Sequence, residues 1–131
     1  MCGIVGYVGC KPVVDILTDG LEQLEYRGYD SSGIAVMCED KIKVYKAVGK
    51  LNNLKSELLQ HKGEYEKATM GIGHIRWATH GAPTVLNAHP HTCSCGNLVL
   101  VHNGIIENYK ELREELMTAG HKFYTDTDSE V

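Results

Sequence analysis

The sequence predicts an α+β fold, in which strands and amphipathic helices share one core. Several short aliphatic runs are bounded by Gly, Asn or Asp, which is typical of strands. Leucines and valines also recur at three- and four-residue spacing, which is typical of helices with one apolar face. Residues 33–37 and 41–48 flank a Glu39-Asp40 turn and read as a hairpin. These patterns together predict a mixed chain of one modest domain.

The first half of the chain reads as alternating strands and helices. Residues 3–8 are small and apolar on both alternating sets, which favours a strand buried on both faces. A helix begins near Lys11-Pro12, since proline is favoured at the first helical position. A turn-rich loop follows at residues 26–33. The remaining expected elements of this half are the hairpin, a helix over 50–60 and a strand over 69–75.

The second half contains one long loop and fewer regular elements. Residues 76–96 have no periodicity, and a loop of that length is usually functional or disordered. We expect a buried strand at 98–102, a helix at 108–119 closed by Gly120, and a short strand at 122–125. Thr127 and Glu130 match a capping box, which predicts that a further helix begins there. We therefore expect the chain to be a fragment of a longer protein.

Composition and charge exclude several classes of function. The chain has 131 residues and a net charge of -4, with no basic run that would indicate nucleic acid binding. No apolar stretch approaches the roughly 20 residues of a membrane span, and the N-terminus lacks the pattern of a signal peptide. An odd number of cysteines, five, favours free thiols in a reducing compartment. These features predict a cytoplasmic protein.

Cys2 is the first candidate for catalysis. If Met1 is removed, one residue carries both a thiol nucleophile and a basic α-amine. The alternative is that Cys2 only follows the start codon.

The second candidate is the segment around Arg76, where several polar and aromatic side chains follow a strand. Arg76 could hold a carboxylate through a two-pronged contact, and Thr79 offers a hydroxyl. Trp77 could cover a pocket, and His80 lies in the same loop. The alternative is that Arg76 and His80 are surface residues and that Trp77 belongs to the core.

Two further candidates lie near the end of the chain. An Asn side-chain amide beside a Gly N–H, as in Asn103-Gly104, can form an oxyanion hole. Asp128 could bind a substrate ammonium group. The alternatives are a plain Asn-Gly turn and a helix cap, both of which the local sequence explains.

A competing constellation is His89, His91, Cys93 and Cys95, which suggests a metal site. Its spacing is poor, because structural zinc sites favour cysteines separated by two to four residues. A polar loop with incidental thiols accounts for this stretch better, and we expect no metal ion or other cofactor.

Taken together, several motifs resemble one family. The chain is similar to the class II glutamine amidotransferases, which are N-terminal-nucleophile hydrolases, and in particular to the glutamine–fructose-6-phosphate aminotransferases (isomerizing). The motifs are Cys-Gly-Ile-Val-Gly from Cys2, Leu-Glu-Tyr-Arg-Gly-Tyr-Asp-Ser at 24–31, His-Ile-Arg-Trp-Ala-Thr-His-Gly at 74–81, Asn-Ala-His-Pro-His at 87–91 and Val-His-Asn-Gly-Ile-Ile-Glu-Asn at 101–108.

The resemblance implies a fold, a reaction and a role for each candidate residue. The fold would be an αββα sandwich, present here in roughly its first half. The chain would hydrolyse the side-chain amide of L-glutamine through a γ-glutamyl thioester and release ammonia. The implied roles are Cys2 as nucleophile, Asn103 and Gly104 as oxyanion hole, Arg76, Trp77, Thr79, His80, His89 and Asp128 as glutamine-binding residues, and Arg27 and Gly28 as lining near the nucleophile.

The resemblance also sets limits on what this chain would do alone. Residues 1–131 would be the N-terminal portion of a glutaminase domain, without the sugar isomerase domains where ammonia meets fructose 6-phosphate. We expect the isolated fragment to be inactive and the parent to form homo-oligomers without nucleic acid or membrane partners. The alternatives are a class II amidotransferase with another ammonia acceptor, or a Cys-His metal-binding module.

Overall fold

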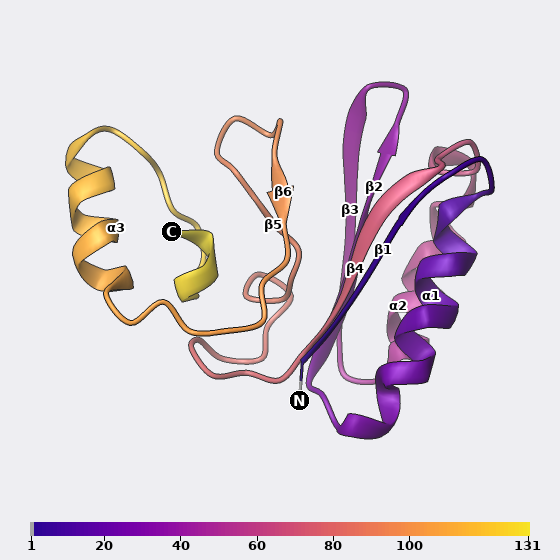
Figure 1. Cartoon of the computed structure of the whole chain (residues 1–131), viewed down its shortest axis with the longest axis horizontal. Coiled ribbons are helices and arrows are strands. Elements are labelled where there is room, and N and C mark those ends of the chain that lie inside the picture. Colours follow the sequence, from indigo (N-terminus) through magenta and orange to yellow (C-terminus); the bar gives the residue numbers. More distant parts are fainter. Residues whose placement is uncertain (1) are drawn as a thin grey trace.

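The computed structural model describes residues 2–131, apart from the side chain of Arg27. Its centre is a four-stranded antiparallel sheet with strand order β1-β4-β2-β3 (Figure 1). The strands are β1 (Gly3–Val8), β2 (Ser31–Cys38), β3 (Lys41–Val48) and β4 (Met70–Arg76). The predicted hairpin is confirmed, since β2 and β3 pair along their full length. The fold is α+β, as the sequence predicts.

The register of the sheet brings distant segments together at one end of its strands. Gly3 pairs with Ile75, and Ser31 pairs with Arg76. The beginning of β1, the beginning of β2 and the end of β4 therefore meet. Cys2, which precedes β1, consequently lies beside the segment that follows Arg76.

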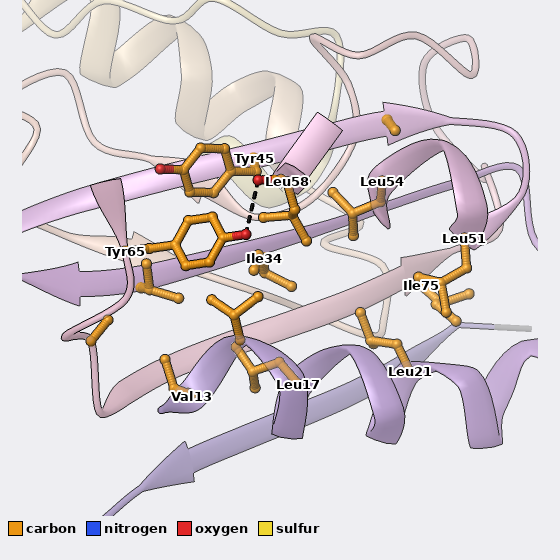
Figure 2. Packing of buried hydrophobic residues seen from close by; sticks show 14 residues of the cluster. Val13, Leu17, Leu21, Ile34, Tyr45, Leu51, Leu54, Leu58, Tyr65 and Ile75 are labelled. Atoms are coloured by element: carbon orange, nitrogen blue, oxygen red, sulfur yellow. Dashed lines mark hydrogen bonds between the residues drawn. The ribbon is translucent and has the colours of Figure 1, made fainter. Parts of the chain in front are cut away.

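Two helices cover one face of the sheet, α1 (Val13–Leu24) and α2 (Leu51–Gln60), joined to the strands by short 3₁₀ turns η1 (Glu25–Arg27) and η2 (Lys62–Glu64) (Figure 1). Their apolar faces supply the leucines that the helical periodicity predicts. Figure 2 shows these side chains packed between helices and strands, with the hydroxyl of Tyr65 donating to the carbonyl of Leu58 at 2.8 Å. The fully buried members include Val13, Leu17, Leu21, Ile34, Leu54 and Ile75.

The opposite face of the sheet is covered at only one end. The segment of residues 87–102 crosses it there and contains a small hairpin, β5 (His91–Thr92) and β6 (Val99–Leu100). A Cβ on Gly33 would lie 2.2 Å from the carbonyl oxygen of His89, so only glycine permits this close crossing. The other end of the face lines a cavity of about 410 Å³ formed by apolar residues such as Val36, Ile42, Met70 and Ile72.

The C-terminal part contains α3 (Tyr109–Thr118) and the 3₁₀ turn η3 (Asp128–Glu130) (Figure 1). Gly120 follows α3 with φ 95° and its N–H bonds the carbonyl of Met117, as expected for a helix-ending glycine. None of the α3 side chains is buried. Across residues 2–131, the structure has no helix long and apolar enough to span a membrane.

Several local predictions are wrong. β1 is an edge strand with alternating burial, and 44% of Ile4 and 77% of Val8 are exposed, so it is not buried on both faces. Residues 122–125 form no strand, and only Val99–Leu100 of the 98–102 run pairs. The expected capping box does not form, because the carboxylate of Glu130 accepts from Tyr124 N and Thr125 N instead of bonding Thr127.

Candidate functional site

The Cys2 thiol lies at the end of the sheet where β1 begins and β4 ends. The backbone N–H of Trp77 donates to Cys2 Sγ at 3.1 Å, and the thiol faces the Trp77 carbonyl at 3.5 Å. The Cys2 residue is half-buried. These two contacts fix the sulfur against the first residue after β4, the position that the strand register requires.

Most predicted site residues line one cavity of about 350 Å³. Segments far apart in the sequence form its wall, including the chain start, the loop after β4, the Asn103-Gly104 turn and the η3 turn. The predicted residues that line it are Cys2, Arg76, Trp77, Thr79, His80, His89, Asn103, Gly104 and Asp128. The structure therefore brings together residues that sequence patterns identified separately.

Arg76 is buried, which contradicts the alternative that it is a surface residue. Its guanidinium donates to three carbonyls of the loop that follows, those of His80, Gly81 and Ala82. Arg76 therefore shapes this loop, and its remaining N–H groups are those that could reach a ligand in the cavity. Trp77, by contrast, is 54% exposed and does not belong to the core.

The loop of residues 77–81 is anchored at both ends. Asp30 accepts a hydrogen bond from the Ala78 N–H, and its own N–H donates to the Arg76 carbonyl at 2.8 Å. The ring of His80 lies 5.2 Å from that of Tyr109 on α3. The loop is thus held between this end of the sheet and α3, and Thr79 lines the cavity.

A pair of stacked imidazoles lies beneath the cavity. His74 is fully buried on β4, and its ring lies 4.2 Å from the ring of His89 at an interplanar angle of 20°. Burial lowers the pKa of His74 to about 4 and the pKa of His89 to about 2, so both imidazoles are neutral at physiological pH. Nε2 of His74 donates to Oδ1 of Asn103 at 2.7 Å.

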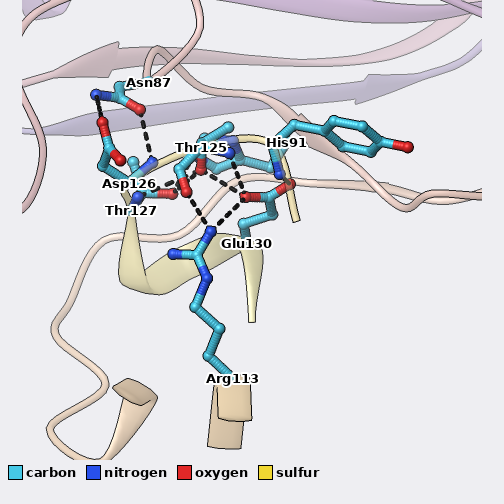
Figure 3. Close-up of polar contacts among 8 residues, drawn as sticks. Asn87, His91, Arg113, Thr125, Asp126, Thr127 and Glu130 are labelled. Carbon is cyan, nitrogen blue, oxygen red and sulfur yellow. Dashed lines mark hydrogen bonds and ion pairs between the residues drawn. The ribbon is translucent and has the colours of Figure 1, made fainter. Parts of the chain in front are cut away.

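A polar network fixes the segment that carries Asp128 (Figure 3). Glu130 accepts from the backbone of Tyr124 and Thr125 at 2.7 Å each, and Arg113 of α3 donates to the Thr125 carbonyl at 2.5 Å. Asn87 accepts from the Asp126 N–H at 2.9 Å. These bonds connect α3 and the 87–91 segment to η3, which therefore lies against the cavity.

Two hydrogen bonds join this network to the site itself. Thr127 Oγ1 lies 3.1 Å from Nε2 of His91, and the Ser129 hydroxyl lies 3.1 Å from Nδ1 of His102. Asp128 is buried, and its Oδ2 accepts from the Ile106 N–H at 2.7 Å. Asp128 thus places a carboxylate of η3 in the cavity wall.

Gly28, one of the two residues predicted to lie near the nucleophile, does not line the cavity. Gly28 has φ 74°, and a Cβ there would lie 3.5 Å from the Trp77 ring, so this glycine lies against the tryptophan. The side chain of Arg27 lies outside the described residues.

The histidines and cysteines of residues 89–95 do not converge. His89 and His91 are buried with their rings 4.4 Å apart, whereas Cys95 is exposed on the hairpin turn. Among the residues that the structure describes, no group of three or more His, Cys, Asp or Glu side chains could hold a metal ion. The metal-site alternative therefore has no support in the geometry.

Sequence reasoning missed residues that position the site. Asp30 and Asn87 form long-range hydrogen bonds to backbone groups, and Glu130 bonds the backbone five residues before it; no local periodicity reveals such bonds. Asn87 and Asp30 do fall inside the quoted motifs at 87–91 and 24–31. Thr127, Ser129 and His102 also line the cavity. His102 falls inside the motif at 101–108, whereas Thr127 and Ser129 were indicated only by their proximity to Asp128 in the sequence.

Comparison with solved structures shows the same fold. The chain aligns with glutamine phosphoribosylpyrophosphate amidotransferase from B. subtilis with a TM-score of 0.76 and 27% identity, over 99% of this chain and 28% of that chain. A second structure, an allosteric regulatory enzyme of purine biosynthesis, gives a TM-score of 0.78 and 28% identity over the same shares.

Sequence relatives are closer. Glutamine–fructose-6-phosphate aminotransferase (isomerizing) is 57% identical in a strain of Thermus thermophilus and 53% identical in Pyrococcus horikoshii, and both alignments cover 100% of this chain and 21% of the relative. The chain thus spans about a fifth of the length of these relatives. The glutamine amidotransferase domain family matches residues 40–131. Because this match covers more than half of the sequence, the chain belongs to the glutamine amidotransferase domain family.

Proposed function

We propose that the chain is the glutamine-hydrolysing part of a glutamine–fructose-6-phosphate aminotransferase. The observation that carries the proposal is one cavity lined by a thiol, an Asn-Gly turn, a guanidinium and a carboxylate. Those groups belong to Cys2, Asn103-Gly104, Arg76 and Asp128. A zwitterionic amino acid with a reactive side-chain amide needs this set of partners.

The reaction begins at the Cys2 sulfur, whose position is set by the Trp77 backbone. Sγ attacks the amide carbon of the glutamine side chain, and the carbonyl electron pair moves to the oxygen. The thiol proton passes to the α-amine of Cys2, which exists once Met1 has been removed. Nucleophile and base then belong to one residue.

The tetrahedral oxyanion is stabilised by the Asn103-Gly104 turn. The Asn103 side-chain amide and the Gly104 N–H supply two donors, and His74 fixes the Asn103 oxygen so that the amide NH₂ is available. The α-ammonium group returns the proton to the leaving nitrogen as the C–N bond breaks, which releases ammonia. Water then attacks the thioester, and glutamate leaves with the Cys2 thiol restored.

Recognition of the substrate uses two side chains of opposite charge in the cavity wall. Arg76, held by the loop carbonyls, faces the α-carboxylate together with the Thr79 hydroxyl. Asp128, held by the Ile106 N–H, faces the α-ammonium group. Trp77 and His80 complete the loop beside the substrate, and His89 supports the site from below.

The ammonia acceptor is assigned from the relatives. The matched relatives are named as enzymes that use fructose 6-phosphate, and identities of 51–57% over the whole chain favour that acceptor. The solved amidotransferases of purine synthesis are 27–28% identical, which favours them less. The acceptor would bind in domains outside the 131 residues of this chain.

A product assay of the intact protein tests the proposal. With glutamine and fructose 6-phosphate, we expect glutamate and glucosamine 6-phosphate in equal amounts. The Cys2→Ala variant should lose both products, while Cys10→Ala, which changes an exposed thiol, should retain both.

Glutamate production by the Cys2→Ala variant would contradict the assigned nucleophile. Glutamate formation without glucosamine 6-phosphate, combined with amination of a different acceptor such as phosphoribosyl pyrophosphate, would keep the glutaminase assignment and reject the assigned acceptor.

A further inference from the structure

The turn of the β5–β6 hairpin carries two cysteines that the glutaminase mechanism does not use. The Cys93 N–H donates to the Leu98 carbonyl at 3.0 Å, and the Gly96 N–H donates to the Cys93 carbonyl at 2.9 Å. Gly96 has φ 74°, which completes the reversal of the chain. Cys93 and Cys95 are therefore the first and third residues of one tight turn, and their side chains are held near each other.

The surroundings of Cys93 favour its thiolate form. The neighbouring side chain of Cys95 is the largest cause, and backbone groups of Leu98, Asn97 and Cys95 add to it, so that the pKa of the Cys93 thiol is lowered to about 7. At neutral pH a large share of Cys93 is consequently thiolate, the reactive form.

Both thiols can be reached from outside. Cys95 is exposed, and Cys93 is half-buried at the rim of a cavity of about 220 Å³. The wall of this cavity carries charged groups of both signs beside the sulfur, Lys122 and Glu130. Neither cysteine lines the cavity that contains Cys2.

We propose that Cys93 and Cys95 form a thiol–disulfide exchange site that reacts with small disulfides. The Cys93 thiolate attacks one sulfur of the disulfide, whose S–S bond breaks and releases one thiolate. The Cys95 thiol loses its proton to solvent, attacks Cys93 Sγ and displaces the second thiolate. The protein gains a Cys93–Cys95 disulfide, and the small disulfide is reduced to two thiols.

The site is independent of the proposed glutaminase activity, since the exchange needs neither Cys2 nor glutamine. The ring that closes is short, and strained or exposed disulfides are easily reduced again. The modification is therefore reversible by ordinary small thiols.

The test uses the intact protein with the Cys2→Ala substitution, so that Cys10 is the only cysteine of its tryptic peptide, with oxidised glutathione as the disulfide and peptide mass mapping after trypsin. Trypsin releases residues 77–110 as one peptide, and Cys93 and Cys95 are its only cysteines. In the protein that retains both Cys93 and Cys95, we expect this peptide to lose the mass of two hydrogens as the disulfide forms. The thiolate share of Cys93, offset by its lower intrinsic nucleophilicity, predicts a reaction roughly three- to sixfold faster than at the exposed Cys10.

Two variants separate attack from ring closure. Cys95→Ser should accumulate a glutathione adduct at Cys93, because no second thiol resolves it. In the Cys93→Ser variant, the remaining Cys95 thiol should react no faster than Cys10. The proposal is overturned if Cys93 reacts no faster than Cys10 in the protein that retains both Cys93 and Cys95. It is also overturned if that protein accumulates the glutathione adduct without closing the Cys93–Cys95 ring.

Discussion

Nε2 of His74 lies 2.7 Å from Oδ1 of Asn103. His74 is fully buried on β4, and Asn103 lies on the exposed turn that borders the cavity. Because a carboxamide oxygen only accepts hydrogen bonds, the neutral imidazole is the donor, in the tautomer with its proton on Nε2. Nδ1 of His74 has no hydrogen-bond partner among the described residues, which is consistent with a lowered pKa. His74 therefore fixes the orientation of the Asn103 amide at the wall of the cavity.

Loss of the His74 donor should lower kcat while leaving KM for glutamine nearly unchanged. His74→Phe keeps a flat ring in the stack but cannot hold the Asn103 oxygen. Removal of one oxyanion-hole donor costs about 100- to 1,000-fold in kcat, so a misdirected donor should cost roughly 10- to 100-fold. Steady-state glutaminase kinetics of the intact protein measure this effect.

His74→Gln should recover part of kcat, since its amide can donate in the same direction. His121→Asn, at an exposed histidine, serves as the matched control and should retain normal kinetics. An unchanged kcat for His74→Phe would show that Asn103 does not need this hydrogen bond.

Asp128→Asn should mainly raise KM for glutamine. The substitution removes the negative charge but keeps an oxygen that can accept from the Ile106 N–H. A hydrogen bond to a charged partner contributes about 1.5–3 kcal/mol, which corresponds to roughly a 10- to 150-fold rise in KM. Asp126→Asn is the control, because Asp126 is exposed two residues away. Equal KM values for the two variants would contradict the role of Asp128 as ammonium partner.

Gly33→Ala should destabilise the protein by disturbing the crossing of residues 89–90 over the sheet. The new Cβ would lie 2.2 Å from the His89 carbonyl oxygen and 3.0 Å from that of Tyr45. Such overpacking costs about 1–3 kcal/mol of unfolding free energy. Gly63→Ala is the control, since a Cβ there has no neighbour within 4 Å. Urea unfolding should separate the two variants, and equal stabilities would contradict the close crossing.

Acid should unfold the protein because its buried histidines resist protonation. Burial lowers the pKa of His74 and His91 to about 4 and that of His89 to about 2. The unfolded chain, with ordinary values near 6.5, binds more protons once the pH falls below about 6.5. Stability is thus present above this pH and is lost progressively down to the folded values, by about 1.4 kcal/mol for each unit of pKa difference.

Urea unfolding of the intact protein between about pH 7.5 and 5 measures this loss, in a range where most carboxylates stay ionised. His91→Asn should give a shallower dependence on pH, whereas His121→Asn should leave the slope unchanged. A free energy of unfolding that stays constant across this range would contradict neutral burial of the three imidazoles.

The sequence predicted best those features that depend on local patterns. The bounds of Gly3–Val8 and Lys41–Val48 agree with the structure. The first is a small apolar run, the second interleaves lysines with apolar residues, and turn residues lie beside both. Candidate residues such as Cys2 and Arg76 could be found because their chemistry is unusual for their position. Chemistry-bearing residues therefore were visible without knowledge of the fold.

Features that depend on long-range partners were not predictable. The burial of β1 depends on which strand lies at the sheet edge, and small residues such as Gly6 fit an edge or a centre equally well. Competition between local partners was not predictable either, since Glu130 could have capped a helix but bonds the nearby Tyr124 and Thr125 instead. The 122–125 segment has a strand-like composition, yet no neighbouring strand among the described residues is available to pair with it.

Cys2 is the proposed nucleophile that attacks glutamine. The most direct measurement is covalent labelling of the intact protein by a diazoketone analogue of glutamine, followed by peptide mass mapping. Trypsin does not cleave between Lys11 and Pro12, so Cys2 and Cys10 share one peptide, and the experiment uses the Cys10→Ser variant to make the label unambiguous. We predict one label per chain, on Cys2, with loss of glutaminase activity in proportion and protection by glutamine. Full labelling of another residue, or inactivation of the enzyme with Cys2 unmodified, would contradict the account.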